Sequence, residues 1–372
     1  MRRLELVCDL GVLKRNALEI RKRVPQSVKM LCVVKADAYG HGAVQTARTL
    51  LDAGLADAFA VATPEEGLEL YESGLRDKPI VVLGQISDYA DAILSAQCGL
   101  SQAVDSPKNA ELMDRAAAQT GKTAKLHIKI DSGMNRTGVK GEVELRRLLD
   151  EIKTLRNVKV EGLFTHFCAA DEDEAFTKQQ NAAFAKAKEI CGEYGFMPVC
   201  HAAASTAMLH REYQYDMVRA GIALYGTGVK ELENVVSPAQ TLLSHVVSIR
   251  RVLKGETVGY SRTFTAARDS LIATIPCGYG DGYPRLMSNR GCVLIEGRRA
   301  PIAGNVCMDM LMVDVTNIPS VTTDTGVVLM GSMGNERITP DEIAAICKTI
   351  PYEIMLGFTN RVHRSWTQSQ EG

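Results

Sequence analysis

Several common signals are missing from this chain of 372 residues. None of its ten cysteines forms a C-x-x-C pair, so neither a zinc knuckle nor a thioredoxin-like redox site is expected, and no metal site is predicted. No run of 18 apolar residues occurs, which argues against a membrane span in this chain. The charged N-terminus is not followed by an apolar stretch, so no signal peptide is visible.

The chain also has few aromatic residues and almost no net charge. Aromatics make up 5% of the chain, and 43 Lys and Arg face 44 Asp and Glu, for a net charge of -1. Neither a basic surface for nucleic acid nor an acidic tail is indicated. The scattered cysteines lie mostly among apolar residues, where cysteine behaves as a small hydrophobe. These features favour a reducing, cytoplasmic location.

The chain is long enough for two domains, with 46% hydrophobic and 23% charged residues. Its first ~220 residues alternate short apolar runs with amphipathic stretches, which is typical of βα units. Eight such units predict an α/β fold with a (β/α)₈ TIM-type barrel over residues 1–232. The predicted strands are Met30–Val34, Ala58–Val61, Ile80–Leu83, Ser101–Val104, Lys125–Ile130, Val158–Thr165, Val199–Ala202 and Met217–Ile222, and the clearest helices are Gly42–Leu51, Pro107–Gln119, Val143–Leu155 and Ala175–Tyr194.

A mostly-β domain is predicted over residues 233–372, where apolar runs are separated by Gly, Pro, Asn and Asp turns. One helix is expected inside it, at Pro340–Cys347. The predicted strands are Thr241–Leu253, Ser270–Ile275, Cys292–Ile295, Met310–Val315 and Gly326–Gly331.

The stretch VVKADAYGHG at Val33–Gly42 is the most informative in the chain. Lys35 ends an apolar strand, which is where a (β/α)₈ barrel builds its active site. An isolated lysine in this position is most often a surface cap. Here Gly40 and Gly42 predict a tight turn into a helix, whose N-terminus could bind an anion together with the Tyr39 hydroxyl.

This stretch resembles the cofactor-lysine motif of the alanine racemase family of pyridoxal-phosphate (PLP) enzymes. Eight further stretches match the family in order, which makes a chance resemblance very unlikely. They are HIKIDSGMNRTG at His127–Gly138, EGLFTHF at Glu161–Phe167, HAAAS at His201–Ser205, VRAGIALYG at Val218–Gly226, VGYSRTFTA at Val258–Ala266, IPCGYGDGYPR at Ile275–Arg285, GNVCMDM at Gly304–Met310 and YEIMLGFTNRVHR at Tyr352–Arg364.

The resemblance implies a two-base racemase. Lys35 would hold PLP as a Schiff base and serve one face of the substrate, while Tyr260 of a partner subunit would serve the other. A tyrosine with a pKa near ~10 needs help to act as a base at pH 7. In the family this help comes through His166 and Arg219. Arg219 would face the pyridine nitrogen and could donate to it but not protonate it, which disfavours transamination.

The remaining roles also follow from the resemblance. The loops after the seventh and eighth strands commonly bind phosphate in barrels, and Ser205, Gly221 and Ile222 lie there. Tyr39, Leu83 and Asn360 match further cofactor contacts of the family. Arg136, the Met308 amide of the partner and Asn360 match its substrate contacts. Lys129, Tyr279 and Asp309 match supporting positions. In many members the lysine that Lys129 matches carries a carbamate. Asp309 is nearly as well explained as a turn cap.

Two residues depart from the family pattern. Ala204 replaces the usual Asn before Ser205, and Asn360 replaces the usual Tyr of alanine-specific members. Asn is smaller and could hydrogen-bond a hydroxymethyl group, so serine is predicted as a substrate beside alanine. Asn360 also resembles the serine/alanine racemases of glycopeptide (vancomycin) resistance clusters. Those proteins are membrane-tethered, and this chain would be their cytoplasmic catalytic half.

We therefore expect a homodimer with shared active sites that interconverts L- and D-serine and L- and D-alanine for cell-wall precursors. An alanine-specific racemase is the main alternative. A PLP-dependent decarboxylase of the same architecture usually has an acidic residue at the pyridine nitrogen, so Arg219 argues against it. A non-catalytic PLP-binding barrel would lack the second domain.

Overall fold

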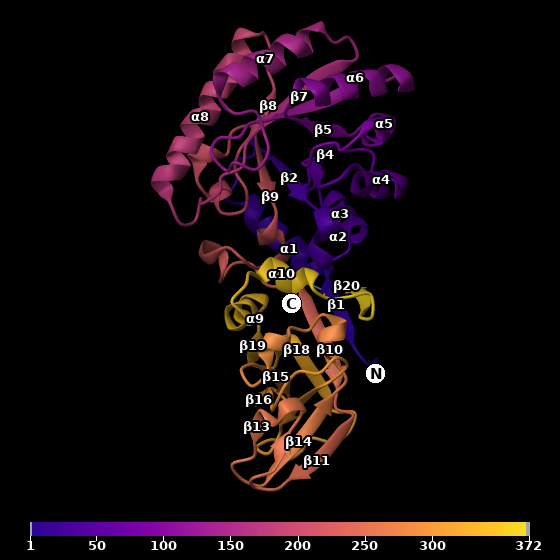
Figure 1. Ribbon diagram of the computed structural model, residues 1–372, viewed down its shortest axis with the longest axis vertical. Coiled ribbons are helices and arrows are strands. Elements are labelled where there is room, and N and C mark those ends of the chain that lie inside the picture. The colour runs from indigo at the N-terminus through magenta and orange to yellow at the C-terminus, as the bar shows by residue number, and fades with distance from the viewer. Residues whose placement is uncertain (1, 370–372) are drawn as a thin grey trace. The chain divides into compact units, whose positions relative to one another are not determined.

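The computed structural model describes residues 2–369 and divides into two compact units (Figure 1). The barrel unit comprises residues 14–38 and 42–224. The β unit comprises residues 2–13, 39–41 and 225–369. A division between residues 232 and 233 was expected, and it stays a prediction. The β unit of the structure also contains two short N-terminal segments, so it is not one continuous stretch of the chain.

Eight parallel strands form the barrel, in the order β8-β7-β6-β5-β4-β3-β2-β9. The two end strands are joined by backbone hydrogen bonds from Arg219 to Ala203 (2.9 Å) and from Asp216 to Cys200 (3.1 Å), so the sheet is nearly closed. The predicted fold class and all eight predicted strands are confirmed, each within two residues at either end. The strands are β2 (Lys29–Val33), β3 (Ala58–Val61), β4 (Ile80–Val82), β5 (Ser101–Val104), β6 (Ala124–Lys129), β7 (Val158–Phe164), β8 (Val199–His201) and β9 (Met217–Ala220).

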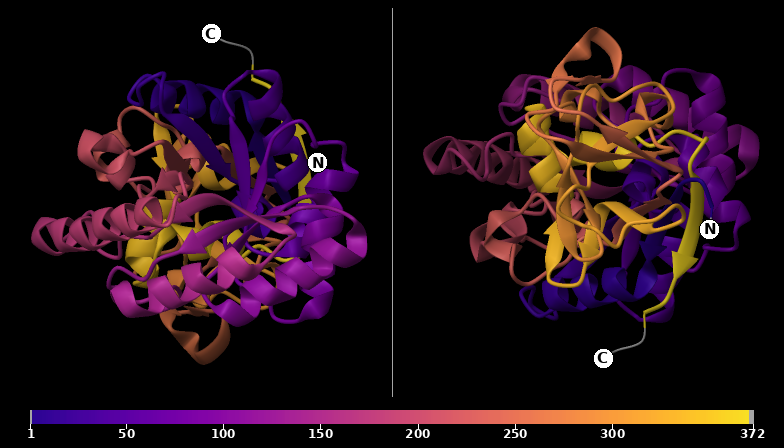
Figure 2. Two further views of the ribbon diagram at one scale, coloured as in Figure 1. Left: turned by 90° about the horizontal axis from the view of Figure 1, so that it is seen from above. Right: turned by 90° about the horizontal axis from the view of Figure 1, so that it is seen from below.

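Helices follow most of these strands and lie outside them when the unit is seen from above (Figure 2). Several begin at a capping side chain that accepts a first-turn amide: Thr63, Asp88, Ser106 and Asp173. Asn16 in α1 donates to the Leu224 carbonyl (3.0 Å), which ties this helix to the segment after β9. The helices are α1 (Leu10–Arg21), α2 (Lys35–Gly40), α3 (Ala43–Asp52), α4 (Pro64–Glu72), α5 (Tyr89–Cys98), α6 (Pro107–Thr120), α7 (Gly141–Thr154) and α8 (Glu174–Glu193).

The β unit contains a mixed sheet in the order β16-β15-β18-β10-β1-β20, in which β19 pairs with β18. A second sheet has the order β11-β14-β17, and β12 pairs with β13. The strands are β1 (Glu5–Asp9), β10 (Gln240–His245), β11 (Ser248–Val252), β12 (Thr257–Val258), β13 (Phe264–Thr265), β14 (Ser270–Ile275), β15 (Cys292–Ile295), β16 (Arg298–Pro301), β17 (Leu311–Asp314), β18 (Gly326–Met333), β19 (Glu336–Ile338) and β20 (His363–Thr367).

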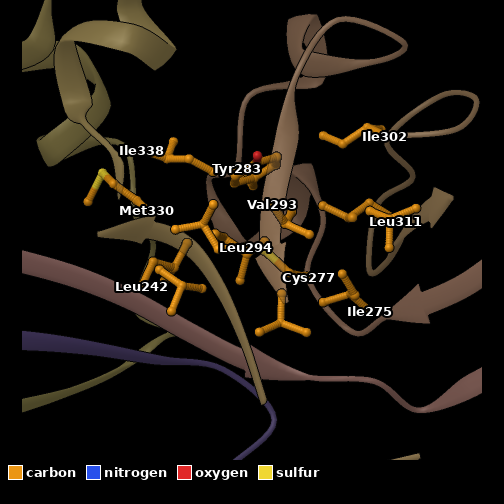
Figure 3. Packing of buried hydrophobic residues seen from close by; sticks show 14 of the residues in the cluster. Leu242, Ile275, Cys277, Tyr283, Val293, Leu294, Ile302, Leu311, Met330 and Ile338 are labelled. Carbon is orange, nitrogen blue, oxygen red and sulfur yellow. The ribbon is translucent and has the colours of Figure 1, made fainter. Parts of the chain in front are cut away.

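Two helices complete the β unit, α9 (Pro340–Cys347), as predicted, and α10 (Pro351–Leu356). Apolar side chains from both sheets and from the helices fill one core, part of which is shown in Figure 3. Burying such side chains is the main favourable term in folding. Short 3₁₀ turns connect the elements of both units: η1 (Ala207–Leu209), η2 (Arg211–Tyr213), η3 (Ile222–Tyr225), η4 (Lys230–Leu232), η5 (Tyr260–Arg262), η6 (Tyr279–Asp281) and η7 (Arg285–Met287).

One predicted strand is wrong in extent. Thr241–Leu253 was expected to be continuous, but the structure ends β10 at His245 and begins β11 at Ser248, in a different sheet. The break falls at Val246 and Val247, where no glycine or proline signals it. Among residues 2–369, no helix combines the length and the apolarity that a membrane span requires.

Candidate active site

The carboxyl ends of the barrel strands bring several predicted site residues to one end of the barrel. Lys35 follows β2, His166 follows β7, Ser205 follows β8 and Gly221 follows β9. The loops at this end of a (β/α)₈ barrel form the active site in nearly all known enzymes of the fold. Leu83, half-buried, follows β4 at the same end.

The short element α2, which begins at Lys35, is a left-handed turn and not a right-handed helix. Ala36, Asp37, Ala38 and Tyr39 have φ values of 51° to 54°, and Gly40 follows at 80°. A run of non-glycine residues in this region is unusual, because Cβ approaches the following carbonyl oxygen. The tight turn expected at Gly40 therefore begins four residues earlier.

The start of helix α3 differs from the expected anion site. The Asp37 carboxylate accepts from the Ala43 amide (2.8 Å), and the Asp37 carbonyl accepts from the Gly42 amide (2.9 Å). These first amides of the helix are therefore already paired within the protein. Asp37 therefore already binds the first amide of α3, and the anion site expected at this helix N-terminus stays a prediction.

Glu66 in α4 holds the other side of the left-handed turn. Its carboxylate accepts from the Ala36 amide (2.8 Å) and from the Ala62 amide (2.6 Å). Burial lowers the pKa of Lys35, the charge of Arg136 lowers it further, and Glu66 opposes this shift. The half-buried Lys35 amine thus loses its proton more readily than an exposed lysine.

Arg219 is buried and tightly bound. One terminal nitrogen donates to His201 Nδ1 (3.1 Å) and to the His201 carbonyl (2.8 Å). The other lies 3.1 Å from His166 Nδ1, 2.8 Å from the Thr165 carbonyl and 2.7 Å from the Ala202 carbonyl. The hydrogen bonds that Arg219 makes to residues 2–369 all leave from these two nitrogens.

Arg219 changes the pKa values of the basic side chains near it. Burial lowers the pKa of Arg219 to about 9, so it remains a cation at pH 7. Burial, followed by the charges of Arg219 and Arg136, lowers the pKa of Lys129 to about 7. Burial and Arg219 also lower the pKa of His166 well below its ordinary value. Arg136 itself lies exposed in the loop between β6 and α7.

The Ser205 hydroxyl lies where two strand-end segments converge. Its oxygen accepts from the amides of Gly221 (3.2 Å) and Ala223 (3.3 Å). Ser205 and Ile222 are buried, so this hydroxyl and the backbone that surrounds it have little access to bulk water. Such a group suits a phosphate.

The other predicted site residues lie in the β unit. Tyr39 is buried, with its ring 4.8 Å from that of Tyr225 and 5.8 Å from that of Tyr352. Burial raises the pKa of the Tyr39 hydroxyl, which keeps it a neutral donor. Asn360 lies exposed in the segment between α10 and β20.

An open pocket of about 700 Å³ groups four predicted residues of the β unit. Tyr260 is 73% exposed and Met308 53% exposed, so both are available to another molecule. The Tyr279 amide donates to the Cys307 carbonyl (2.9 Å), which joins the two loops. Arg361 donates to the Asp309 carboxylate (2.7 Å), and this ion pair accounts for Asp309 better than the turn-capping role considered from the sequence.

Three residues with prominent contacts received no role in the sequence prediction: His127, His201 and Glu161. His127 Nδ1 lies 3.0 Å from His201 Nε2 inside the barrel. All three belong to the stretches that match the family, and this match was the signal that could have identified them. Their contacts join residues far apart in sequence, so the sequence does not show them.

Known proteins resemble the chain over nearly its whole length. The family models for the alanine racemase N-terminal and C-terminal domains match residues 8–228 and 239–366. The alanine racemase of Halothermothrix orenii is 40% identical, and the alignment covers 96% of this chain and 95% of that protein.

Solved structures agree with these matches. The alanine racemase of Bacillus anthracis with bound L-Ala-P is 33% identical with a TM-score of 0.90, covering 99% of this chain and 96% of that one. The alanine racemase of Streptomyces coelicolor A3(2) is 29% identical with a TM-score of 0.93, covering 98% of each chain. This chain therefore belongs to the alanine racemase family, whose cofactor is pyridoxal 5′-phosphate.

Proposed function

We propose that this protein racemises alanine and serine, with Lys35 and Tyr260 as the two bases. The observation that carries the proposal is the setting of Arg219, whose partners in residues 2–369 are three carbonyls and two imidazoles. An arginine held in this way can donate a hydrogen bond but cannot pass on a proton. A cofactor ring beside it stays unprotonated, which favours racemisation over decarboxylation.

The residues of the barrel unit fit PLP. Lys35 would attach it, Ser205 with the Gly221 and Ile222 backbone would hold its phosphate, and Arg219 would face its ring nitrogen. The amide donors at Ser205 match the phosphate chemically. Leu83 of the barrel unit and Tyr39 of the β unit are proposed as further contacts. When bound, the cofactor stabilises negative charge at the substrate α-carbon.

Lys35 is suited to exchange the α-proton on its side of the substrate. Burial and the charge of Arg136 favour its neutral amine, which can accept a proton. The negative charge of the neighbouring Glu66 opposes this shift in the pKa of Lys35.

Tyr260 would serve the opposite face from a second copy of the chain. Arg219 donates to His166 Nδ1, so the proton of the neutral His166 ring is on Nε2 and can be donated onward. A donor of this kind would stabilise the Tyr260 oxygen when it gives up its proton. The exposure of Tyr260 and Met308 supports a homodimer with shared active sites.

The substrate carboxylate would be bound by Arg136 and by the Met308 amide, with Tyr279 and Asp309 lining the entrance. Lys129 would support Arg136. Since its pKa is about 7, a large share of its amine is neutral at pH 7 and can react with carbon dioxide. The resulting carbamate would be an anion that relieves the repulsion from Arg136 and Arg219.

Asn360 is the basis for proposing serine beside alanine. Its side chain offers both a donor and an acceptor, and it occupies less space than tyrosine. A site with a partner for a substrate hydroxyl discriminates in favour of that hydroxyl. A role in glycopeptide resistance rests on the same residue, and a role in cell-wall supply rests on the resemblance to the family; both stay predictions.

Side-by-side assays with L-alanine and L-serine, following the D-products, test this proposal. Asn360→Tyr should lower serine turnover relative to alanine by about tenfold or more. Asn360→Ala is the matched control, because it removes the hydrogen-bonding group and leaves the space open. The proposal fails for serine if alanine is turned over far faster and Asn360→Tyr leaves the ratio unchanged.

A further inference from the structure

Two histidines extend the contacts of Arg219 through the barrel interior. His201 Nδ1 faces Arg219 (3.1 Å), and His201 Nε2 faces His127 Nδ1 (3.0 Å). His127 belongs to β6 and His201 to β8, so the contact passes across the intervening strand β7. It does so at Gly162, where an added Cβ would lie 2.3 Å from His127 Nδ1. The absence of a side chain at Gly162 makes the contact possible.

The direction of every hydrogen bond in this chain is fixed by the arginine. Arg219 can only donate, so His201 Nδ1 must accept and the His201 proton must lie on Nε2. That proton is donated to His127 Nδ1, which places the His127 proton on Nε2. The chain therefore ends on an N–H of His127 that points away from Arg219.

Glu161 lies at this end. Its carboxylate is 3.7 Å from His127 Nε2, which is longer than a hydrogen bond but places the anion next to this N–H. The Ser101 hydroxyl, from the first residue of β5, donates to the same oxygen (2.6 Å). The carboxylate is thus held in place by a partner outside the histidine pair.

An irregularity of β7 gives Glu161 this position. Leu126 pairs with Val160, but the next residue, His127, pairs with Gly162, so Glu161 is an extra residue in the ladder. Bulges are rare in parallel sheets, and they commonly redirect a side chain near an active site. Here the bulge places a carboxylate beside His127.

We propose that Glu161 is a positioning residue that acts through His127 and His201 to hold Arg219 as a charged donor toward the ring nitrogen of the cofactor. This inference rests on the proposed function. Arg219 is a buried cation whose acceptors in residues 2–369 are all neutral. A buried charge is costly unless it is compensated. Glu161 supplies the compensating charge through two polarised rings.

The state of Glu161 agrees with this role. The neighbouring His127 ring lowers the pKa of Glu161 to about 2, and the Ser101 hydroxyl contributes, so the carboxylate stays an anion. Polarisation along a chain of hydrogen bonds strengthens each of them. The anion should therefore make His201 Nδ1 a better acceptor for Arg219.

Nitrogen NMR of the histidine rings tests the inference in the holoenzyme. In the wild type, His127 and His201 should each show a protonated Nε2 and an unprotonated Nδ1. In Glu161→Gln the His127 Nε2 proton should move upfield and exchange faster with water. Glu161→Asp should restore part of the shift. Ser101→Ala keeps the charge and should have a smaller effect, and the exposed Glu193→Gln should have none.

Function is followed in the same variants. Glu161→Gln should shift the absorbance band of bound PLP and lower kcat about tenfold. This factor is the smallest loss usually seen when a residue that supports a metal ligand is removed. KM should change less than kcat, because Glu161 does not touch the substrate. A merely structural role would lower stability without moving the ring-nitrogen signals or the absorbance band.

Two results would overturn the inference. One is a protonated His201 Nδ1 in the wild type, which reverses the chain and can be observed even if Glu161→Gln does not fold. The other is a Glu161→Gln enzyme with unchanged ring signals and absorbance. If the wild type racemises neither alanine nor serine, the proposed function fails, while the NMR and absorbance measurements still decide the role of Glu161.

Discussion

Burying the side chain of Lys129 costs free energy of folding. It is buried in β6, with its Nζ 5.0 Å from the ring centroid of Phe164. Burial and two nearby arginines lower its pKa to about 7. The unfolded chain would hold the same proton up to the ordinary lysine pKa near ~10.4. Folding therefore releases a proton from Lys129 over most of the pH range between about 7 and ~10.4.

This difference predicts a pH-dependent effect of Lys129→Met. Between pH 7 and about 10 the folded protein binds fewer protons than the unfolded chain, so wild-type stability should rise with pH. The variant lacks this cost, and its free energy of unfolding should exceed that of the wild type by up to about 5 kcal/mol below pH 7. The excess should shrink toward pH 10. Denaturant unfolding at pH 6 and pH 9, in buffer free of carbon dioxide, measures it.

The exposed Lys159 in β7 provides the control, since Lys159→Met should show no such trend. Added bicarbonate should stabilise the wild type at alkaline pH but not Lys129→Met, because only the wild type can form the carbamate. A difference between wild type and Lys129→Met that stays constant from pH 6 to pH 9 would contradict the pKa of about 7.

Sequence reasoning placed single residues well where the signal was local. Lys35 could be placed at a strand end because an apolar run stops next to it. The contact between His127 and His201 spans 74 positions and needs Gly162 on a third strand, so no local pattern encodes it. The position of Glu161 depends on a bulge, which alternation along the strand does not reveal.

At the level of elements, the left-handed turn after Lys35 is the most unusual feature. Each non-glycine residue in this conformation costs roughly 1–2 kcal/mol. Such strain persists only where surrounding contacts enforce it. Here the Glu66 carboxylate binds the Ala36 amide, and the Asp37 carboxylate binds the Ala43 amide. The turn is therefore held at both ends by acidic side chains.

Removing one of these restraints should loosen the segment that carries Lys35. Glu66→Ala leaves the Ala36 and Ala62 amides without their acceptor and should lower the free energy of unfolding by about 1–3 kcal/mol. It should also lower the pKa of Lys35 further, since Glu66 opposes the shift caused by burial. Denaturant unfolding and the NMR titration of labelled Lys35 measure the two effects.

Glu65 is a matched control, because it is the neighbouring acidic residue in the first turn of α4 and is exposed. Glu65→Ala should change both quantities far less. Equal losses in the two variants would mean that the acidic first turn of α4 matters only for the helix.

The barrel strands were predictable because parallel strands buried on both faces are continuous apolar runs, as in β3 and β4. The left-handed turn was not, since alanine and tyrosine rarely adopt it. Strand β1 was also missed. Its Glu5–Asp9 segment gains its partners β10 and β20 from positions more than 200 residues away, a pairing that short patterns cannot show.

At the scale of the whole molecule, the proposed machinery is divided between the two units. Lys35, Arg219 and Ser205 belong to the barrel unit, while Tyr260 and Met308 are exposed on the β unit. A homodimer in which each β unit completes the partner's barrel would use both sets. Closed two-fold dimers make such an exchange reciprocal, so two equivalent sites result.

Mixing two inactive variants tests this arrangement. Lys35→Ala and Tyr260→Phe should each abolish or strongly reduce racemisation alone. If sites are shared, a mixed dimer carries both lesions in one site and neither in the other. Random exchange makes half of the dimers mixed, so activity should return to about a quarter of the wild-type level. Mixing Lys35→Ala with the double variant Lys35→Ala/Tyr260→Phe should restore nothing, because every site then lacks Lys35. If each chain instead builds its own site, the first mixture also stays inactive after exchange has been demonstrated.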